Sequence, residues 1–146
     1  MKTILFVCVG NAGRSQMAEA FAKLHGTGKI EAQSAGTVPA EHVNPLVVQV
    51  MTEKGLDLAN NRPKRLRHEM ARAADLIITM GCSVEEVCPA PLLKGKTLID
   101  WGLDDPKGQP IEKVKEIRDE IERRVEELLS TLSREQGREG AGEPVN

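Results

Sequence analysis

The sequence has 146 residues, which is enough chain for one domain with one hydrophobic core. Only 2% of the residues are aromatic, which disfavours a surface that binds RNA or single strands by stacking. The net charge of −2 also argues against general nucleic-acid binding, so a local site must hold any bound anion. The apolar N-terminus is too short for a signal peptide, and no apolar run approaches a membrane span. We therefore expect a cytoplasmic protein that binds neither nucleic acid nor membrane.

The first predicted elements are a strand, a loop and a helix. Residues 2–7 form a continuous apolar run with β-branched side chains, which predicts a buried strand. Residues 8–13 contain two glycines and an asparagine, and this composition indicates a tight loop. Residues 15–25 predict an amphipathic helix. Its expected apolar face consists of Met17, Ala18, Phe21, Ala22 and Leu24.

The middle of the chain predicts a second strand followed by two helices. Residues 30–34 indicate the strand. Asn44 can cap a helix and Pro45 suits its first position, while Gly55 is expected to end it. A basic segment then leads into a short helix that ends near Ala73.

Two more strands and one long helix complete the predicted order. Residues 75–80 and 96–101 read as strands, with a long loop or broken helix over residues 81–94 between them. Residues 110–133 predict an amphipathic helix, because apolar side chains recur every three or four positions. Residues 134–146 are polar and glycine-rich, which predicts a disordered tail.

The alternation of strands and helices predicts an α/β fold in a single domain over residues 1–133. We expect a four-stranded parallel sheet with helices on both faces. Ligands of such folds bind outside the carboxyl ends of the strands. Cys8, Cys82 and the pair Asp104 and Asp105 each follow a predicted strand, so they should meet at one edge of the sheet.

The strongest chemical motif is the segment from Cys8 to Ser15. Between a strand and a helix, successive backbone N–H groups can form a nest for an anion, and the helix N-terminus adds partial positive charge. Arg14 offers a planar fork for two oxygens of a tetrahedral anion, and the Ser15 hydroxyl can donate to the Cys8 sulfur. These features favour a nucleophilic Cys8 thiolate over a structural cysteine beside a surface arginine. The residues expected to bind the oxyanion are Val9, Gly10, Asn11, Ala12, Gly13 and Arg14.

These residues also carry a family resemblance. Residues 6–11 and 14–19 resemble the low-molecular-weight protein tyrosine phosphatases and the thioredoxin-coupled arsenate reductases that share their fold. The second segment is similar to the reductase branch, since the phosphatases usually have proline where Gln16 stands. Residues 34–37 also fit this superfamily. The resemblance covers about residues 2–130 and implies the α/β fold predicted above.

An acidic pair supplies a candidate proton donor, which displacement of an oxygen from arsenate or phosphate requires. By spacing alone, an aspartate in residues 101–106 is more typical of a turn. The resemblance implies a general acid in an Asp-Pro pair, so we assign Asp105 first and Asp104 second. The phosphatases typically follow this pair with an aromatic residue. Here Lys107 and Gly108 follow and the chain has no tyrosine, which weakens the tyrosine phosphatase interpretation.

Two further cysteines, Cys82 and Cys88, permit three interpretations from the residues alone: inert buried thiols, a zinc site or a redox pair. Their spacing does not match a zinc knuckle. The resemblance implies a relay in which Cys8 attacks arsenate while Asp105 protonates the departing oxygen. Cys82 then attacks Cys8, arsenite leaves, and Cys88 attacks Cys82. Thioredoxin, or a similar dithiol, would reduce the resulting disulfide.

The resemblance also raises the question of a cation beneath the anion loop. Asn11, Glu19 and Ser34 could match the ligands that some family members use. The basic segment over residues 62–65 stands where we would seek another acidic ligand, so a lysine in place of the cation is the alternative. We therefore assign no metal and no cofactor. The histidines lack ligand spacing and are expected at the surface; they are His25, His42 and His68.

The sequence as a whole predicts an arsenate reductase that binds an arsenate or phosphate oxyanion and is regenerated by thioredoxin. The alternative enzyme is a phosphatase that hydrolyses phosphomonoesters through a phosphocysteine intermediate on Cys8. A non-enzymatic sensor of oxyanions is a third possibility, against which the predicted acid segment argues.

Overall fold

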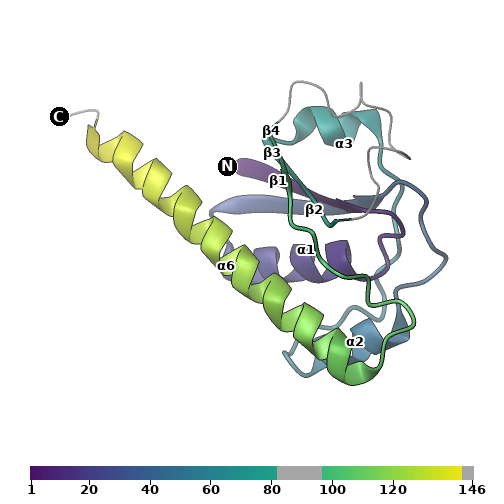
Figure 1. The fold of residues 1–146 in the computed structure, drawn as a ribbon. Coiled ribbons are helices and arrows are strands. Elements are labelled where there is room, and N and C mark those ends of the chain that lie inside the picture. The colour runs from purple at the N-terminus through teal and green to yellow at the C-terminus, as the bar shows by residue number, and fades with distance from the viewer. Residues whose placement is uncertain (82–96, 143–146) are drawn as a thin grey trace.

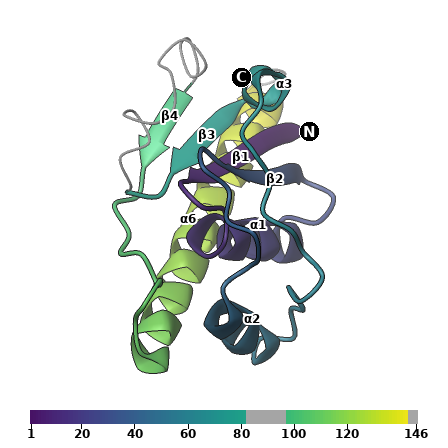
Figure 2. The same cartoon turned by 90° about the vertical axis from the view of Figure 1, so that its right-hand side faces the viewer.

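The computed structural model describes residues 1–81 and 97–142. Within these ranges, four parallel strands form one sheet in the order β2-β1-β3-β4 (Figures 1 and 2). The predicted four-stranded parallel sheet is therefore confirmed. The strands are β1 (Lys2–Cys8), β2 (Ile30–Gly36), β3 (Leu76–Thr79) and β4 (Thr97–Asp100).

Helices cover both faces of the sheet, as the sequence predicted. Helices α1 and α6 lie against one face, and α3 lies against the other (Figure 1). Helix α2 lies beyond α1 on the first side, where it also contacts α6. The helices are α1 (Arg14–His25), α2 (Pro45–Thr52), α3 (His68–Ala73) and α6 (Ile111–Gly142).

The apolar run of β1 is buried on both faces, which explains why it is continuous rather than alternating. Ile4 and Phe6 point into the larger core, together with side chains of α1, α2 and α6. Leu5 and Val7 point into the smaller core under α3. The central strand is thus fixed from both sides, and its carboxyl end at Cys8 is held at the middle of the sheet.

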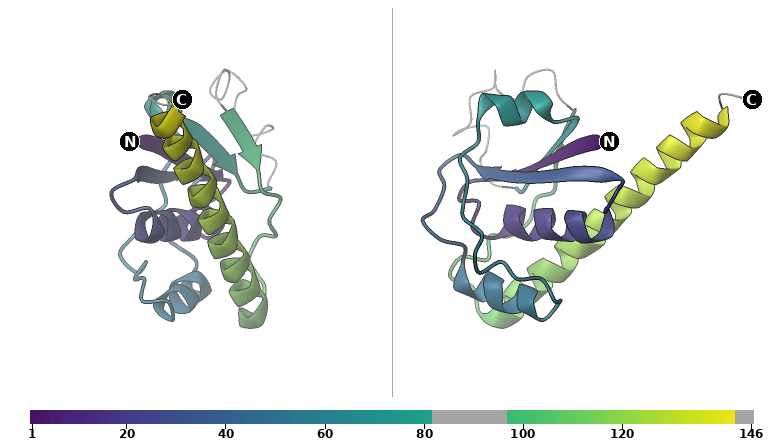
Figure 3. Two further views of the ribbon diagram at one scale, coloured as in Figure 1. Left: turned by 90° about the vertical axis from the view of Figure 1, so that its left-hand side faces the viewer. Right: turned by 180° about the vertical axis from the view of Figure 1, so that it is seen from behind.

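The long helix α6 crosses the sheet diagonally and extends beyond it (Figure 3). Its buried stripe follows the predicted spacing and consists of Val114, Ile117, Ile121, Val125 and Leu132. The helix continues to Gly142, past the end that we expected near Ser133. The first proline after Ser133 is Pro144, so the sequence holds no strong helix breaker before that point. None of the helices in the two described ranges has the length and hydropathy to cross a bilayer.

Two other details differ from expectation. Strand β2 continues to Gly36 rather than ending near Ser34, because it pairs with β1 along the whole of that strand. Leu24 is 48% exposed and does not belong to the apolar face of α1. On an ideal helix it lies about 90° from the middle of that face, in the last turn, so it falls at the margin of the packed surface.

Candidate active site

Cys8 lies at the carboxyl end of β1 and is only 3% exposed. Its sulfur lies 2.9 Å from the Ser15 hydroxyl oxygen and accepts a hydrogen bond from the backbone N–H of Asn11 at 3.2 Å. Asn11 adopts a left-handed backbone conformation, with φ of 51°, which asparagine tolerates better than most residues. Two polar groups therefore lie against the sulfur: the Asn11 N–H from the loop and the Ser15 hydroxyl from the first turn of α1.

The segment after β2 determines which way the peptide groups of this loop face. Four loop carbonyls accept hydrogen bonds from backbone N–H groups of residues 37–44, at 2.8 to 3.2 Å. In a trans peptide the N–H points opposite to the C=O, so the N–H groups of the same four peptides turn to the inside of the loop. Such a row of inward amides binds anions. The carbonyls belong to Cys8, Val9, Gly10 and Ala12, and their donors to Thr37, Val38, Ala40 and Asn44.

Two glycines allow the surrounding segments to approach the loop. A Cβ on Gly36 would lie 2.5 Å from the Val9 carbonyl oxygen and 2.9 Å from the Asn11 nitrogen. A Cβ on Gly13 would lie 2.8 Å from Cγ of Pro106. Both contacts are far too short for any side chain, so glycine lets β2 and the Asp-Pro segment close onto the loop.

Arg14 is 5% exposed and ties three parts of the chain together. Its Nη1 donates to the Met80 carbonyl at 2.8 Å and to the Leu103 carbonyl at 3.0 Å. Met80 follows β3, and Leu103 follows β4. The structure thus brings the loop and the ends of these two strands to one edge of the sheet, as the sequence predicted for this fold.

The two neighbouring aspartates face different partners. Asp105 Oδ2 lies 3.5 Å from Nη2 of Arg14, while its Oδ1 accepts a hydrogen bond from the Lys107 backbone N–H at 2.9 Å. Asp104 Oδ2 instead lies 3.0 Å from Nζ of Lys113 on α6, and this contact raises the pKa of Lys113. The geometry therefore favours Asp105 as the carboxylate next to the anion loop.

A buried polar network beneath the loop was not recognised from the sequence. Gln16 is fully buried and its Nε2 donates to Asn11 Oδ1 at 3.0 Å. The same oxygen accepts the Lys64 backbone N–H at 2.8 Å, and Asn11 Nδ2 donates to the Ser15 hydroxyl at 2.7 Å. The available signal was a polar residue directly after the motif, in the first turn of the predicted helix. Two of its partners, Asn61 and Arg62, lie 45 and 46 residues away along the chain, so the sequence does not reveal them.

A lysine lies at the candidate cation position beneath the loop. Lys64 Nζ lies 3.4 Å from the Ser34 hydroxyl oxygen and 3.6 Å from Glu19 Oε1, and Ser34 donates to the same carboxylate. Lys23 Nζ lies 2.7 Å from the other oxygen of Glu19. Two ammonium groups thus already compensate Glu19, and the residues present do not fit a bound metal cation. Among the residues that the structure describes, none form a cluster of three or more histidine, cysteine, aspartate or glutamate ligands.

Comparison with known proteins identifies the family. The model of the family described as low molecular weight phosphotyrosine protein phosphatase matches residues 3–138. The chain belongs to this family. It is 44% identical to a putative arsenate reductase of Halobacterium salinarum over 133 residues, which cover 88% of this chain and 91% of that protein.

Two solved structures of relatives represent different activities. A thioredoxin-dependent arsenate reductase of Corynebacterium glutamicum superposes with a TM-score of 0.76 at 38% identity over 91% of this chain. This chain spans 62% of the length of that longer protein. An arginine phosphatase of Geobacillus stearothermophilus gives a TM-score of 0.82 at 32% identity, covering 93% of this chain and 96% of its own. The phosphatase-family fold thus supports both reduction and hydrolysis.

The remaining predicted site residues of this family member, Cys82 and Cys88, lie outside the described residues. The chain is described up to Gly81, which precedes Cys82. The Gly81 N–H donates to Asp100 Oδ1 at 2.7 Å, and Asp100 also accepts from the Thr79 hydroxyl at 2.9 Å. Gly81 has φ of +81°, and a Cβ there would lie 2.6 Å from Cα of Gly102. The end of β3 is therefore anchored at the same edge of the sheet as the anion loop.

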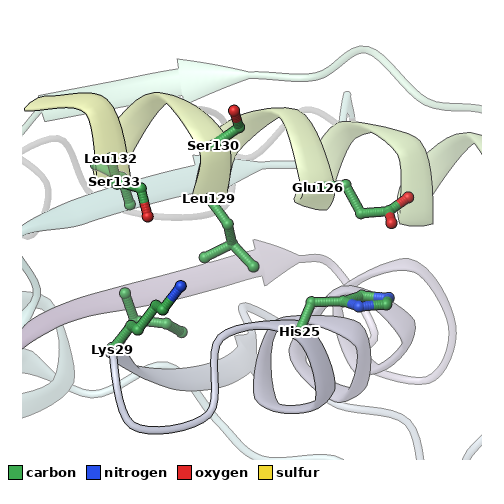
Figure 4. Close-up of a pocket in the computed structure, with 8 residues that line it drawn as sticks. His25, Lys29, Glu126, Leu129, Ser130, Leu132 and Ser133 are labelled. Carbon is green, nitrogen blue, oxygen red and sulfur yellow. The ribbon is translucent and has the colours of Figure 1, made fainter.

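Of the cavities lined by described residues, two that lie at opposite ends of α1 bear on the site. One, of about 550 Å³, lies beside the anion loop and is walled by residues 38–44 and 105–107. The other, of about 270 Å³, lies between α6 and the turn from α1 to β2, where it is lined by His25, Lys29 and Glu126 (Figure 4). Helix α1 has 12 residues, so its two ends are roughly 17 Å apart. The second cavity is therefore separate from the candidate active site.

Proposed function

We propose that this phosphatase-family protein is an arsenate reductase in which Cys8 is the nucleophile. One observation carries the proposal. The buried sulfur lies within hydrogen-bond distance of the Ser15 hydroxyl and the Asn11 N–H, inside a loop of inward amides that ends at Arg14. The putative arsenate reductase of Halobacterium salinarum, matched over 88% of this chain and 91% of that protein, supports arsenate as the oxyanion.

The first chemical step forms a bond between sulfur and arsenic. The loop amides of residues 9–14 and the Arg14 guanidinium hold the arsenate oxygens, and the Cys8 thiolate attacks the arsenic atom. Asp105 gives its proton to the departing oxygen, which leaves as water. The product is an arsenate group on Cys8. Asp105 suits this role because it already lies at the guanidinium that would hold the substrate.

The second step reduces arsenic and needs one more thiol, and freeing Cys8 afterwards needs another. The Cys82 thiolate attacks the Cys8 sulfur, the electron pair of the sulfur–arsenic bond passes to arsenic, and arsenite leaves. Cys88 then attacks Cys82 and frees Cys8. Thioredoxin, or a similar dithiol, reduces the disulfide between Cys82 and Cys88. The assignment of these two thiols rests on their order in the sequence and on the resemblance to thioredoxin-coupled reductases.

Serine variants of the three cysteines test this scheme. Fully reduced wild type mixed with arsenate should yield one arsenite per protein in a single turnover. Cys8→Ser should yield none, and should also lose hydrolysis of p-nitrophenyl phosphate. Cys82→Ser should yield no arsenite, whereas Cys88→Ser should yield one and stop with Cys8 and Cys82 joined. If Cys82→Ser and Cys88→Ser both turn over with thioredoxin at the wild-type rate, the relay is wrong.

Phosphate ester hydrolysis is the second candidate function, and the cavity beside the loop favours it. Its volume of about 550 Å³ exceeds the space that a single arsenate ion needs. A phosphatase requires only Cys8, Arg14 and Asp105, because water can resolve a phosphocysteine. The rate of p-nitrophenyl phosphate hydrolysis by the wild type, set beside its rate of arsenate reduction, distinguishes the two functions. Rapid hydrolysis without arsenate reduction by the wild type would favour the phosphatase.

A further inference from the structure

We propose that Gln16 is a positioning residue that directs the Ser15 hydroxyl hydrogen onto the Cys8 sulfur. The inference rests on Cys8 as the nucleophile of the proposed function. It is independent of which oxyanion the enzyme converts, and its test measures the reactivity of the thiol rather than turnover.

The orientation of the Gln16 amide is fixed by the backbone. Its Nε2 lies 3.4 Å from the Arg62 carbonyl and 3.0 Å from Asn11 Oδ1, while its Oε1 accepts from Asn61 Nδ2 at 3.1 Å. A carbonyl can only accept, so the atom facing Arg62 must be the amide nitrogen. Gln16 therefore donates to Asn11.

The orientation of the Asn11 amide follows in the same way. Its Oδ1 lies 2.8 Å from the Lys64 backbone nitrogen, which can only donate. Together with Gln16, this contact occupies both lone pairs of the amide oxygen. The amide nitrogen of Asn11 must then face Ser15, whose hydroxyl oxygen lies 2.7 Å away.

The last link is the hydroxyl of Ser15, which has one hydrogen. Its oxygen accepts from Asn11 and lies 2.9 Å from the Cys8 sulfur, so its hydrogen turns to the sulfur. With the Asn11 backbone N–H, the sulfur then has two donors. Hydrogen bonds donated to the charged form of a group favour that form, so this arrangement favours the thiolate.

Replacing Gln16 should weaken the preference of the Ser15 hydroxyl hydrogen for the Cys8 sulfur. It does so without changing any residue that contacts the sulfur. In Gln16→Glu a carboxylate oxygen would face the Asn11 oxygen, and repulsion would favour a flipped Asn11 amide that accepts from Ser15. The Ser15 hydrogen would then leave Cys8. In Gln16→Met the Asn11 oxygen keeps only the Lys64 donor, so the same flip costs less than in the wild type.

The experiment measures alkylation of Cys8 by iodoacetamide in reduced protein between pH 5 and pH 9. Trypsin releases residues 3–14 as one peptide that contains Cys8 and no other cysteine, so mass spectrometry reads this thiol alone. Both Gln16 variants should shift the pH profile upward, with about tenfold slower alkylation at pH 6, as for loss of one hydrogen bond to a charged group. Gln33→Glu on β2, at an exposed position, is the matched control and should keep the wild-type profile. Wild-type profiles in both Gln16 variants would overturn the proposal.

A double-mutant cycle asks whether Gln16 acts through Ser15. Ser15→Ala should itself slow alkylation at pH 6, and adding Gln16→Met should then change little. A full additional tenfold loss in the double variant would show that Gln16 acts by another route.

Nuclear magnetic resonance tests the network in the wild type alone, so this measurement does not depend on whether a variant folds. The side-chain amide hydrogens of Asn11 and Gln16 should exchange with solvent much more slowly than those of the exposed Gln33. Equal exchange rates would contradict the network.

Discussion

Two adjacent aspartates show how strongly local contacts divide residues of the same type. Asp105 lies at the Arg14 guanidinium, whereas Asp104 turns outward to Lys113 on α6. Neither position can be distinguished from the amino-acid types alone. The difference arises because Pro106 packs over Gly13, which brings the residue before the proline to the loop. A single position in the chain thus decides which carboxylate can serve the chemistry.

The Asp-Pro assignment leads to a direct kinetic comparison. Asp105→Asn removes a proton donor with little change in shape, and general acid catalysis contributes about 10²–10⁴-fold. We expect single-turnover attack on arsenate to slow within that range while anion binding persists. Asp104→Asn is the matched control and should stay within a few-fold of wild type. A larger loss in the control would show that Asp104 is the acid.

For individual residues, the sequence predicted the motif itself better than the buried polar network that holds the motif in place. Cys8 and the pair Asp104 and Asp105 could be placed together because each follows a predicted strand, and Arg14 belongs to the same loop motif as Cys8. The contacts of Gln16 could not, because they depend on residues 61–64 crossing beneath the loop. Hydrophobic periodicity does not report where such an irregular segment runs.

Among the elements, the connection after β2 does the most to shape the site. Its backbone holds four loop carbonyls outward, and Gly36 lets it approach to van der Waals contact. Gly36 also donates to the Lys64 carbonyl and accepts from Leu66, so one residue joins the loop, β2 and the basic segment. The loop geometry is therefore imposed from outside rather than by the loop residues alone.

Gly36→Ala should damage activity more than stability. Its Cβ would overlap the Val9 carbonyl oxygen and the Asn11 nitrogen, and overpacking of this kind costs about 1–3 kcal/mol. We expect kcat/KM for arsenate to fall at least tenfold, because the displaced peptides bear the N–H groups that we propose bind the anion. Gly28→Ala is the control. Gly28 has a φ of +78°, but no atom lies within 4 Å of the position that an alanine Cβ would occupy. It should lose stability and keep wild-type kinetics, and equal kinetic losses would contradict this interpretation.

The extent of the elements was predicted less well than their order. The order of strands and helices followed from periodicity and from glycine and proline positions. The end of β2 depends on pairing with β1 through Cys8, which a sequence pattern does not show. The exposure of Leu24 depends on where the packed surface ends, so it too required the assembled fold.

For the molecule as a whole, α6 joins the helical layer through buried and partly buried charges. Arg118 is 7% exposed, and its Nη1 donates to the Val50 carbonyl near the end of α2 and to Glu53, each at 2.9 Å. Glu122 lies 2.9 Å from Nε2 of His25 and 3.1 Å from Nζ of Lys54. These contacts connect α6 to the ends of α1 and α2.

The Glu122 contacts make stability depend on pH. Burial acts to raise the pKa of Glu122, but hydrogen bonds from His25 and Lys54 outweigh it and hold the pKa below the ordinary 4.5. A lowered folded-state pKa contributes stability above the unfolded value, and this contribution is lost as pH falls through the folded pKa. We expect Glu122→Gln to lower the free energy of unfolding at pH 7 by up to about 1 kcal/mol.

The deficit of Glu122→Gln relative to wild type should shrink as pH falls below 4.5, measured by urea unfolding at several pH values. Glu126→Gln, an exposed change on the same helix, is the matched control and should show no such dependence. A deficit of constant size from pH 7 to pH 3 would mean that the effect is not electrostatic.

The hydrogen bonds that turn the loop carbonyls outward have a thermodynamic consequence. Residues 37–44 come after β2, and the segment near Lys64 comes later still, so the inward amides exist only when distant parts of the chain have docked. The unfolded chain cannot assemble this anion receptor. An oxyanion that binds the native loop therefore draws the whole folding equilibrium towards the native state, by about 2.7 kcal/mol at one hundred times its dissociation constant. The substrate is in this sense also a stabiliser of the enzyme that consumes it.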